Sequence, residues 1–233
     1  MGDMKFFIEN QKIERELEWV ISLVKLHMNG ATTAQMENGG IHYRLNYGVG
    51  IPHLKQLSKR IPNSYELAER MWFQEIRETM ILATIVVPAD EMTAERCHEW
   101  AEKITNKDIV ERSSMFLWWR LPVINDLLPL WFKSPNQFLK ATGMFTFGRM
   151  IQNNQRIMTY DSSSLINLLN DKDELLVLKA LSFAIRMNIR HQYADETSVR
   201  KFIEKLNASN DVNQHMIAEE LISELEMLKD QFK

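Results

Sequence analysis

The residues best suited to chemistry stand at the start of one stretch, TNKDIVERSSMFLWWRLP (residues 105–122). Thr105 and Asp108 have the spacing of a capping box, which predicts that a helix begins there. The apolar residues that follow recur at helical spacing on both faces, so we expect this helix to be packed between neighbours. Its polar first turn, with Lys107, Asp108 and Glu111, would then be free to meet a ligand.

Two interpretations of this polar turn stay open. Glu111 could act as a functional carboxylate, or it could be the solvated partner of Lys107 one turn before it, an arrangement worth only a few tenths of a kcal/mol. Lys107 itself suits a phosphate contact or plain surface. Asp108 is expected to cap the helix, because an acid in the first turn is favoured by the helix dipole.

Other catalytic patterns are missing from the sequence. The six histidines and Cys97 do not cluster as metal ligands, and His98 directly follows Cys97, so the two would point to different sides of a helix. No nucleophile elbow, phosphate loop or dinucleotide fingerprint occurs. We therefore expect no metal and no cofactor, and neither a serine-type hydrolase nor a nucleotide-driven enzyme.

Composition bounds the remaining possibilities. With 233 residues, 45% of them hydrophobic, the chain can bury a sizeable core, and no linker suggests a boundary within residues 1–233. A net charge of -3 gives no general attraction to nucleic acid or membrane, although only the local field at a binding face matters. The single cysteine fits a reducing compartment. No apolar run approaches the ~20 residues of a membrane span, and the N-terminus lacks a signal-peptide core, so we expect a cytoplasmic protein without a membrane partner.

The hydrophobic periodicity predicts an all-α protein. Glycine (8) and proline (6) are scarce, and no segment alternates with period two. A loop with two glycines is expected at residues 32–46, after a first helix closed by Gly30. The predicted helices span residues 8–27, 52–61, 65–71, 75–86, 93–103, 105–122, 123–132, 136–152, 163–170, 173–190, 196–206 and 213–232. Short helices with brief links favour an α-solenoid of paired-helix repeats of roughly 40 residues over a four-helix bundle.

Aromatic and basic residues each allow a functional and a structural interpretation. Four tryptophans could be stacking platforms, but aromatics at helical spacing are expected in the core: Trp72, Trp118, Trp119 and Trp131. Cations dense in the last third could grip a nucleic-acid backbone or form ordinary solvated helix faces: Lys179, Arg186, Arg190, Arg200, Lys201 and Lys205. A smaller patch, with the same ambiguity, consists of Lys55, Lys59 and Arg60.

Four segments, in the right order, resemble the DNA alkylation repair family of AlkD type, which is built from HEAT-like repeats. They are YGVGIPHLKQLSKRI (47–61), MWFQEIRETMILA (71–83), ITNKDIVERSS (104–114) and LKALSFAIRMNIR (178–190). The resemblance implies an α-solenoid superhelix whose concave groove binds double-stranded DNA. It further implies hydrolysis of the glycosidic bond of N3- and N7-alkylated purines. Such a base already carries positive charge and leaves without a general acid, so a fixed carboxylate that stabilises the oxocarbenium-like sugar is sufficient.

The resemblance places the catalytic carboxylate at Glu111. The family's active helix reads Trp-Asp-x-x-Asp, and the matching residues here are Lys107, Asp108, Ile109, Val110 and Glu111. Glutamate is one methylene longer than aspartate and moves the charge by ~1 Å or more, which matters where geometry sets the rate. Lys107 replaces an aromatic face with a like charge near a cationic lesion.

The resemblance also assigns residues that flank the substrate or bind DNA. Phe183, in KALSFAIR, falls on a family tryptophan and keeps a ring with weaker cation–π attraction. Lys140 falls on one of a pair of family arginines, and Gly50 replaces another arginine. Three further cations would support the grip on the DNA backbone: Lys179, Arg186 and Arg190.

Two functions follow from these patterns. The first is an AlkD-like DNA-binding protein, either a glycosylase for alkylated purines or a relative in which that reaction is weakened or lost. The second is a non-catalytic helical-repeat scaffold that holds a protein partner. An exposed Glu111 among cations favours the first, whereas an apolar or acidic binding face favours the second.

Overall fold

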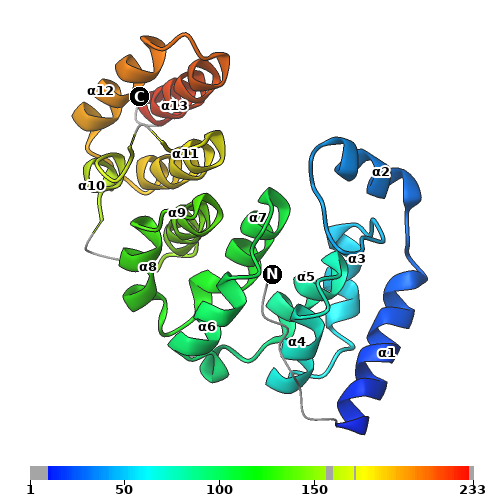
Figure 1. Ribbon diagram of the computed structural model, residues 1–233. Helices are drawn as coiled ribbons and strands as arrows, with labels where there is room; N and C mark the ends of the chain where they lie inside the picture. Colours follow the sequence, from blue (N-terminus) through cyan, green and yellow to red (C-terminus); the bar gives the residue numbers. More distant parts are fainter. Residues whose placement is uncertain (1–9, 156–159, 171, 231–233) are drawn as a thin grey trace. The chain divides into compact units, whose positions relative to one another are not determined.

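The computed structural model describes residues 10–155, 160–170 and 172–230 (Figure 1), which form helices joined by short loops. Among these residues no strand forms beyond an isolated bridge between Leu45 and Ile76. The helices are α1 (Gln11–Lys25), α2 (Gly30–Asn38), α3 (Ile51–Ser58), α4 (Tyr65–Trp72), α5 (Arg77–Val86), η1 (Ala89–Glu91), α6 (Ala94–Ala101), α7 (Lys107–Phe116), η2 (Trp118–Arg120), α8 (Ile124–Phe132), α9 (Gln137–Gln152), α10 (Ser162–Ile166), α11 (Leu175–Arg190), α12 (Glu196–Asn207) and α13 (Val212–Asp230). The predicted all-α class is confirmed.

The chain divides into two compact units, one ending at Leu117 and the other beginning at Trp118. Each unit has its own buried core. The two units are defined by the contacts within each of them, which does not test whether residues 1–233 form one domain. The single-domain organisation therefore stays a prediction.

In the first unit, α5 is the central helix. It contacts α1, α3, α4 and α7, and all of its residues except Ile85 are buried. Trp72 of α4 stacks on Trp100 of α6 at a centroid distance of 4.8 Å. Cys97 lies buried in the same helix, and burial together with the charge of Glu95 raises the pKa of its thiol to about 12. The thiol therefore stays protonated at neutral pH.

The second unit is built from helix pairs in two layers. Helices α9, α11 and α13 pack side by side and form one layer. Helices α8, α10 and α12 form the second layer, which packs against one face of the first (Figure 1). Trp118 and Trp131 are buried and meet edge to face at 5.2 Å. Together with the buried Trp72, they confirm the core interpretation for three of the four tryptophans, whereas Trp119 is partly exposed.

Several predicted boundaries are wrong. The helices expected at residues 52–61 and 163–170 end at Ser58 and Ile166, and two differences are larger. Residues 30–38, expected to close the first helix and open a flexible loop, form helix α2, because the Asn29 side chain accepts a hydrogen bond from the Thr32 backbone N–H and caps it. The helix expected to reach Pro122 ends at Phe116, and residues 118–120 form a 3-10 turn instead. The predicted start at residue 8 and end at residue 232 lie outside the described residues.

Candidate nucleic-acid interface

Helix α7, which carries the predicted carboxylate, is capped by Asn106. The Asn106 Oδ1 accepts hydrogen bonds from the backbone N–H groups of Asp108 and Ile109 at 3.0 and 3.2 Å. The predicted capping box between Thr105 and Asp108 is therefore wrong by one position. Asparagine satisfies the free backbone donors of a first turn as well as threonine does, so the sequence allowed both.

Asp108 is not a cap but the centre of a buried polar cluster. Its Oδ2 accepts hydrogen bonds from Arg77 Nε at 2.8 Å and from the Tyr43 hydroxyl at 3.1 Å. Its Oδ1 accepts one from Arg112 Nε at 3.1 Å. Asp108 is 4% exposed and Arg77 3%. A charge so deeply buried is stable only when it is paired and hydrogen-bonded, as it is here.

Glu78 extends the cluster to the loop before α3. Its two carboxylate oxygens accept hydrogen bonds from the backbone N–H groups of Tyr47 and Val49, at 3.0 and 3.1 Å. Arg77 Nη1 donates both to Glu78 Oε1 at 3.1 Å and to the Val49 carbonyl at 2.9 Å. Gly48 makes this turn possible, since its φ is 70° and an added Cβ would lie 2.2 Å from the Asn29 carbonyl.

The ionisation of the cluster follows from its burial. Burial, and next the charge of Asp108, raise the pKa of Tyr43 well above its ordinary value, so its phenol remains a hydrogen-bond donor. Burial alone would lower the pKa of Arg77, but the charges of Asp108 and Glu78 outweigh it and the pKa is raised. Arg77, Glu78 and Asp108 therefore fix the loop before α3, the start of α5 and the first turn of α7 to one another.

Glu111 lies one helical turn beyond Asp108 and is partly exposed. Among the described residues its carboxylate has no hydrogen bond or ion pair. The alternative interpretation, a Lys107–Glu111 pair, is not formed, because Lys107 Nζ donates to the Gly39 carbonyl at 2.7 Å instead. The first unit thus presents a part-exposed carboxylate on a rigidly held helix, an arrangement able to stabilise positive charge on a bound molecule.

Phe183, on α11 of the second unit, is partly exposed and packs against α9. The Arg149 guanidinium lies over its ring at 4.6 Å, and the Phe145 ring lies 5.6 Å away. Gly148 allows this contact, since a Cβ there would come within 2.6 Å of the Phe183 ring and 3.1 Å of the Ala184 Cα. The Arg149 cation already covers the ring. The predicted role of Phe183 beside the substrate stays a prediction.

Replacing Gly148 by alanine is expected to lower the free energy of unfolding by about 1–3 kcal/mol, because the added methyl overpacks the α9–α11 contact. Gly30→Ala is the matched control: a Cβ at that position meets nothing within 4 Å. Alanine in a helix loses less backbone entropy than glycine, so the control should be neutral or slightly stabilising. Urea unfolding of both variants measures the difference. Equal stabilities would contradict the close approach at Gly148.

Lys140 does not present its charge at the surface, as a phosphate contact requires. It is 2% exposed, and its Nζ donates to both carboxylate oxygens of Asp173, at 2.9 and 2.6 Å, and to the Leu168 carbonyl at 2.9 Å. These three acceptors use all the donors of an ammonium group. Lys140 therefore ties α9 to the segment before α11, and we leave it out of the proposed interface.

The other predicted DNA-binding cations share α11, but two of them are paired. Arg190 makes a two-fold contact with Glu224 of α13, at 2.6 and 2.8 Å, and that hydrogen bonding raises its pKa. Arg186 lies 3.6 Å from Glu220 of the same helix. Lys179 is exposed and has no hydrogen bond or ion pair among the described residues. Glu220 and Glu224 of α13 thus partly neutralise the predicted DNA-binding cations of α11.

Sequence reasoning missed the buried cluster around Asp108. Its one visible signal was the pair Arg77-Glu78 at the start of the otherwise apolar run TMILATIV, where charges need partners. The partners stand far away in the sequence, and Tyr43 lies within residues 32–46, which the glycines predict to be a loop. No group of three or more potential metal-ligating side chains occurs within the described ranges, and no helix there is long and apolar enough to cross a membrane.

A family model described as DNA alkylation repair enzyme matches residues 20–221, which is most of the chain. The chain belongs to the DNA alkylation repair enzyme family. The resemblance seen in the sequence is thereby confirmed. No curated protein sequence matches the chain significantly.

The fold of this family member is also found in a solved structure. That structure represents "a new family of proteins related to the HEAT-like repeat DNA glycosylases with affinity for branched DNA structures". The two chains share 14% sequence identity with a TM-score of 0.69, and the similarity covers 93% of each. The likeness confirms the predicted HEAT-like helical-repeat architecture.

Proposed function

We propose that this member of the DNA alkylation repair enzyme family binds duplex DNA and is a weak glycosylase for N3- and N7-alkylated purines. Glu111 would stabilise the oxocarbenium-like sugar. The observation that carries the proposal is the carboxylate of Glu111, which is partly exposed and has no hydrogen bond or ion pair among the described residues. The resemblance places the family's catalytic aspartate at this position. The family assignment supports the choice of substrate class.

Two departures explain why the reaction would be slow. The longer side chain of Glu111 moves the carboxylate by ~1 Å or more from where an aspartate would hold it. Lys107 removes the aromatic face next to the lesion and adds a positive charge near a cationic base. Measured release of methylated purines from alkylated duplex DNA tests the reaction. Residual release should disappear in Glu111→Gln while DNA affinity is kept, and unchanged release in that variant would refute the assigned role.

The DNA-binding part is tested by the salt dependence of affinity. Lys179→Gln is expected to weaken duplex binding regardless of sequence and to make the slope of log K against log salt shallower by about 1, as for the loss of one phosphate contact. Fluorescence anisotropy at several salt concentrations measures this slope. Lys12→Gln is the matched control, since its side chain is 81% exposed on α1. Equal slopes for both variants would remove Lys179 from the interface.

Branched DNA belongs in the same assay. The structurally similar protein is described by its affinity for branched DNA structures. A four-way junction of the same total length as the duplex should therefore be compared with it at each salt concentration. Tighter junction binding would place this chain's DNA role with branched structures, whereas equal affinity would favour duplex recognition.

A non-catalytic scaffold that binds a protein partner is the second candidate. The observation in its favour is the pairing of Arg186 and Arg190 with Glu220 and Glu224, which leaves the α11–α13 face with compensated charge. This candidate predicts no salt-dependent DNA binding and no purine release, so the same two measurements separate it from the first.

A further inference from the structure

The guanidinium group of Arg112 is held in one direction by a buried carboxylate. Arg112 lies on α7, one helical turn after Asp108, and its Nε donates a hydrogen bond to the Asp108 Oδ1 at 3.1 Å. The side chain of Asp108 is 3% exposed, whereas that of Arg112 is 27% exposed. The second carboxylate oxygen, Oδ2, accepts hydrogen bonds from Arg77 and Tyr43, so Asp108 is itself fixed in place. One nitrogen of Arg112 is therefore anchored, while the rest of the group lies nearer to solvent.

The remaining donors of this guanidinium group are available to a ligand. Arginine carries five N–H donors, and the hydrogen bond to Asp108 uses the one on Nε. In the part of the chain that the structure describes, neither Nη1 nor Nη2 of Arg112 forms a hydrogen bond. These two nitrogens form one edge of the planar group, whose parallel N–H bonds match two oxygens of a phosphate. Because the side chain is partly exposed, such oxygens can reach this edge.

Arg112 stands next to Glu111 in the chain, yet the two charges are not paired. Side chains of consecutive residues on an α-helix point about 100° apart, whereas residues four apart lie on the same side. Asp108, four residues before Arg112, thus draws the guanidinium group back along the helix. The Glu111 carboxylate forms no ion pair with Arg112 or with any other described residue. One turn of α7 therefore presents a negative and a positive charge side by side, both partly exposed.

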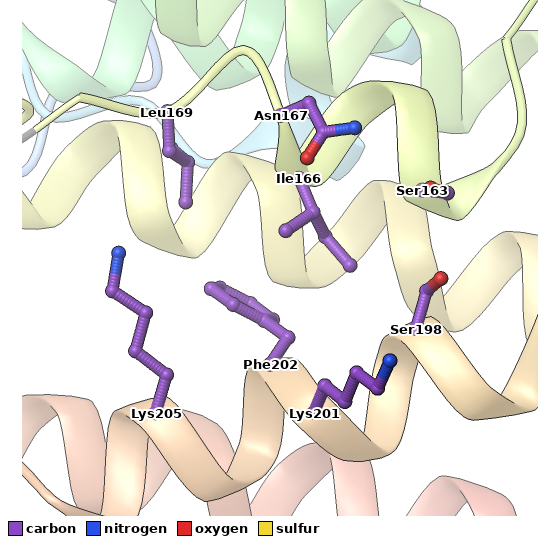
Figure 2. A pocket seen from close by; sticks show the side chains of 8 residues that line it. All are labelled: Ser163, Ile166, Asn167, Leu169, Ser198, Lys201, Phe202 and Lys205. Carbon is purple, nitrogen blue, oxygen red and sulfur yellow. The ribbon is translucent and has the colours of Figure 1, made fainter.

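Exposed cations alone do not form such an arrangement. In the pocket of about 390 Å³ between α10 and α12, the side chains of Lys201 and Lys205 point to opposite ends, with Phe202 between them (Figure 2). The two ammonium groups do not converge on one anion, and neither is held by a hydrogen bond to a described residue. Arg112 differs because a buried carboxylate, that of Asp108, fixes the direction of its charge.

We propose that Arg112 binds a backbone phosphate of the DNA strand whose sugar faces Glu111, and that Asp108 positions Arg112 so that it does not pair with Glu111. This inference rests on the proposed DNA function of the chain. A reacting nucleotide carries both charges, because its phosphate is an anion and its sugar gains positive charge as the base leaves. The guanidinium group and the carboxylate on neighbouring residues complement these two charges. An ion pair between Arg112 and Glu111 would instead neutralise both groups and leave neither for the nucleotide.

The salt dependence of duplex binding tests the phosphate contact. In fluorescence anisotropy with the full-length protein, Arg112→Gln is expected to weaken binding by about tenfold and to make the slope of log K against log salt shallower by about 1. Arg112→Lys keeps the charge and should keep the slope, while its affinity falls because lysine lacks the planar pair of donors. The matched control is Arg15→Gln, which removes an exposed arginine from α1 and should change neither quantity. Equal slopes for Arg112→Gln and the unmodified protein would overturn the proposal.

The rate of purine release separates binding from catalysis. Arg112→Gln should require about tenfold more protein for half-maximal single-turnover release, while the maximal rate stays within about twofold because Glu111 is retained. A general loss of structure would lower the maximal rate as well. A maximal rate reduced as strongly as in Glu111→Gln would therefore contradict a role in phosphate binding.

The positioning role of Asp108 is tested by the exchange of the Arg112 Nε–H with water. This rate is measured by NMR on the ¹⁵N-labelled protein, and the signal is assigned by its loss in Arg112→Gln. Glu111→Gln should leave the exchange rate unchanged, because Nε donates to Asp108. Exchange about tenfold faster in Glu111→Gln would show that Arg112 pairs with Glu111 and would overturn the positioning role.

Failure of the proposed function would give a different pattern. An unmodified protein that binds duplex DNA but releases no purine would refute the glycosylase reaction and leave the salt slope as the test of Arg112. An unmodified protein without salt-dependent DNA affinity would refute the DNA role and the phosphate contact together.

Discussion

Replacing Asp108 by asparagine is expected to lower the free energy of unfolding by about 3–5 kcal/mol, the usual cost of removing one partner from a buried ion pair. Asp108 accepts hydrogen bonds from Tyr43, Arg77 and Arg112, and Arg77 is buried with it. Asparagine keeps the size of the side chain but loses the negative charge. The buried guanidinium of Arg77 would then keep only one carboxylate partner, that of Glu78.

The control for this change is Glu111→Gln, three residues further along the same helix. Glu111 is partly exposed and its carboxylate has no described partner, so the stability of that variant should stay within about 0.5 kcal/mol of the unmodified protein. Urea-induced unfolding followed by tryptophan fluorescence measures both. A loss of less than about 1 kcal/mol in Asp108→Asn would show that the cluster contributes no more than an exposed salt bridge does.

Restoring the family residues in a Lys107→Trp, Glu111→Asp variant is expected to raise the rate of methylated-purine release by about a hundredfold. A displacement of about 1 Å at a reacting centre can cost that much. The tryptophan would add a face for the cationic base and remove a like charge from its vicinity. The measurement is single-turnover release of 7-methylguanine from alkylated duplex DNA.

The structure makes this variant practicable. Lys107 is exposed, and its one described contact, to the Gly39 carbonyl, lies at the surface, so its loss should change stability by less than about 1 kcal/mol. Lys107→Trp alone tests the aromatic face separately from the carboxylate. If DNA affinity is preserved in the double variant and release does not rise, Glu111 is not the catalytic carboxylate of this chain.

The sequence predicted the helices well where apolar periodicity and capping residues agreed. Helix α9 was expected at residues 136–152 and occupies Gln137–Gln152, with Asn136 as its cap. The prediction failed at α2, whose sequence GATTAQMEN has almost no apolar stripe. A helix of that kind depends on its cap and its neighbours rather than on amphipathicity, and periodicity does not detect it.

Only part of the candidate site could be predicted from the sequence. The resemblance placed Glu111 and Lys107 on one turn, and both do lie on α7. It could not show that Asp108 would be buried, that Lys140 would pair with Asp173, or that Arg190 would pair with Glu224. In each case the residue type was compatible with both a surface and a buried position.

The all-α class, most helix boundaries and the family were determined by the sequence alone, because helical spacing and caps depend on residues within a few positions of one another. Which charges remain available to a ligand was decided only by the tertiary structure. The partners of Asp108, Lys140 and Arg190 stand between 28 and 65 residues away, apart from Arg112 on the same helix. Burial raises the cost of an unpaired charge, so folding itself selects which carboxylates and cations become structural. Within the described part of the chain it leaves Glu111 and Lys179 without a hydrogen bond or ion pair.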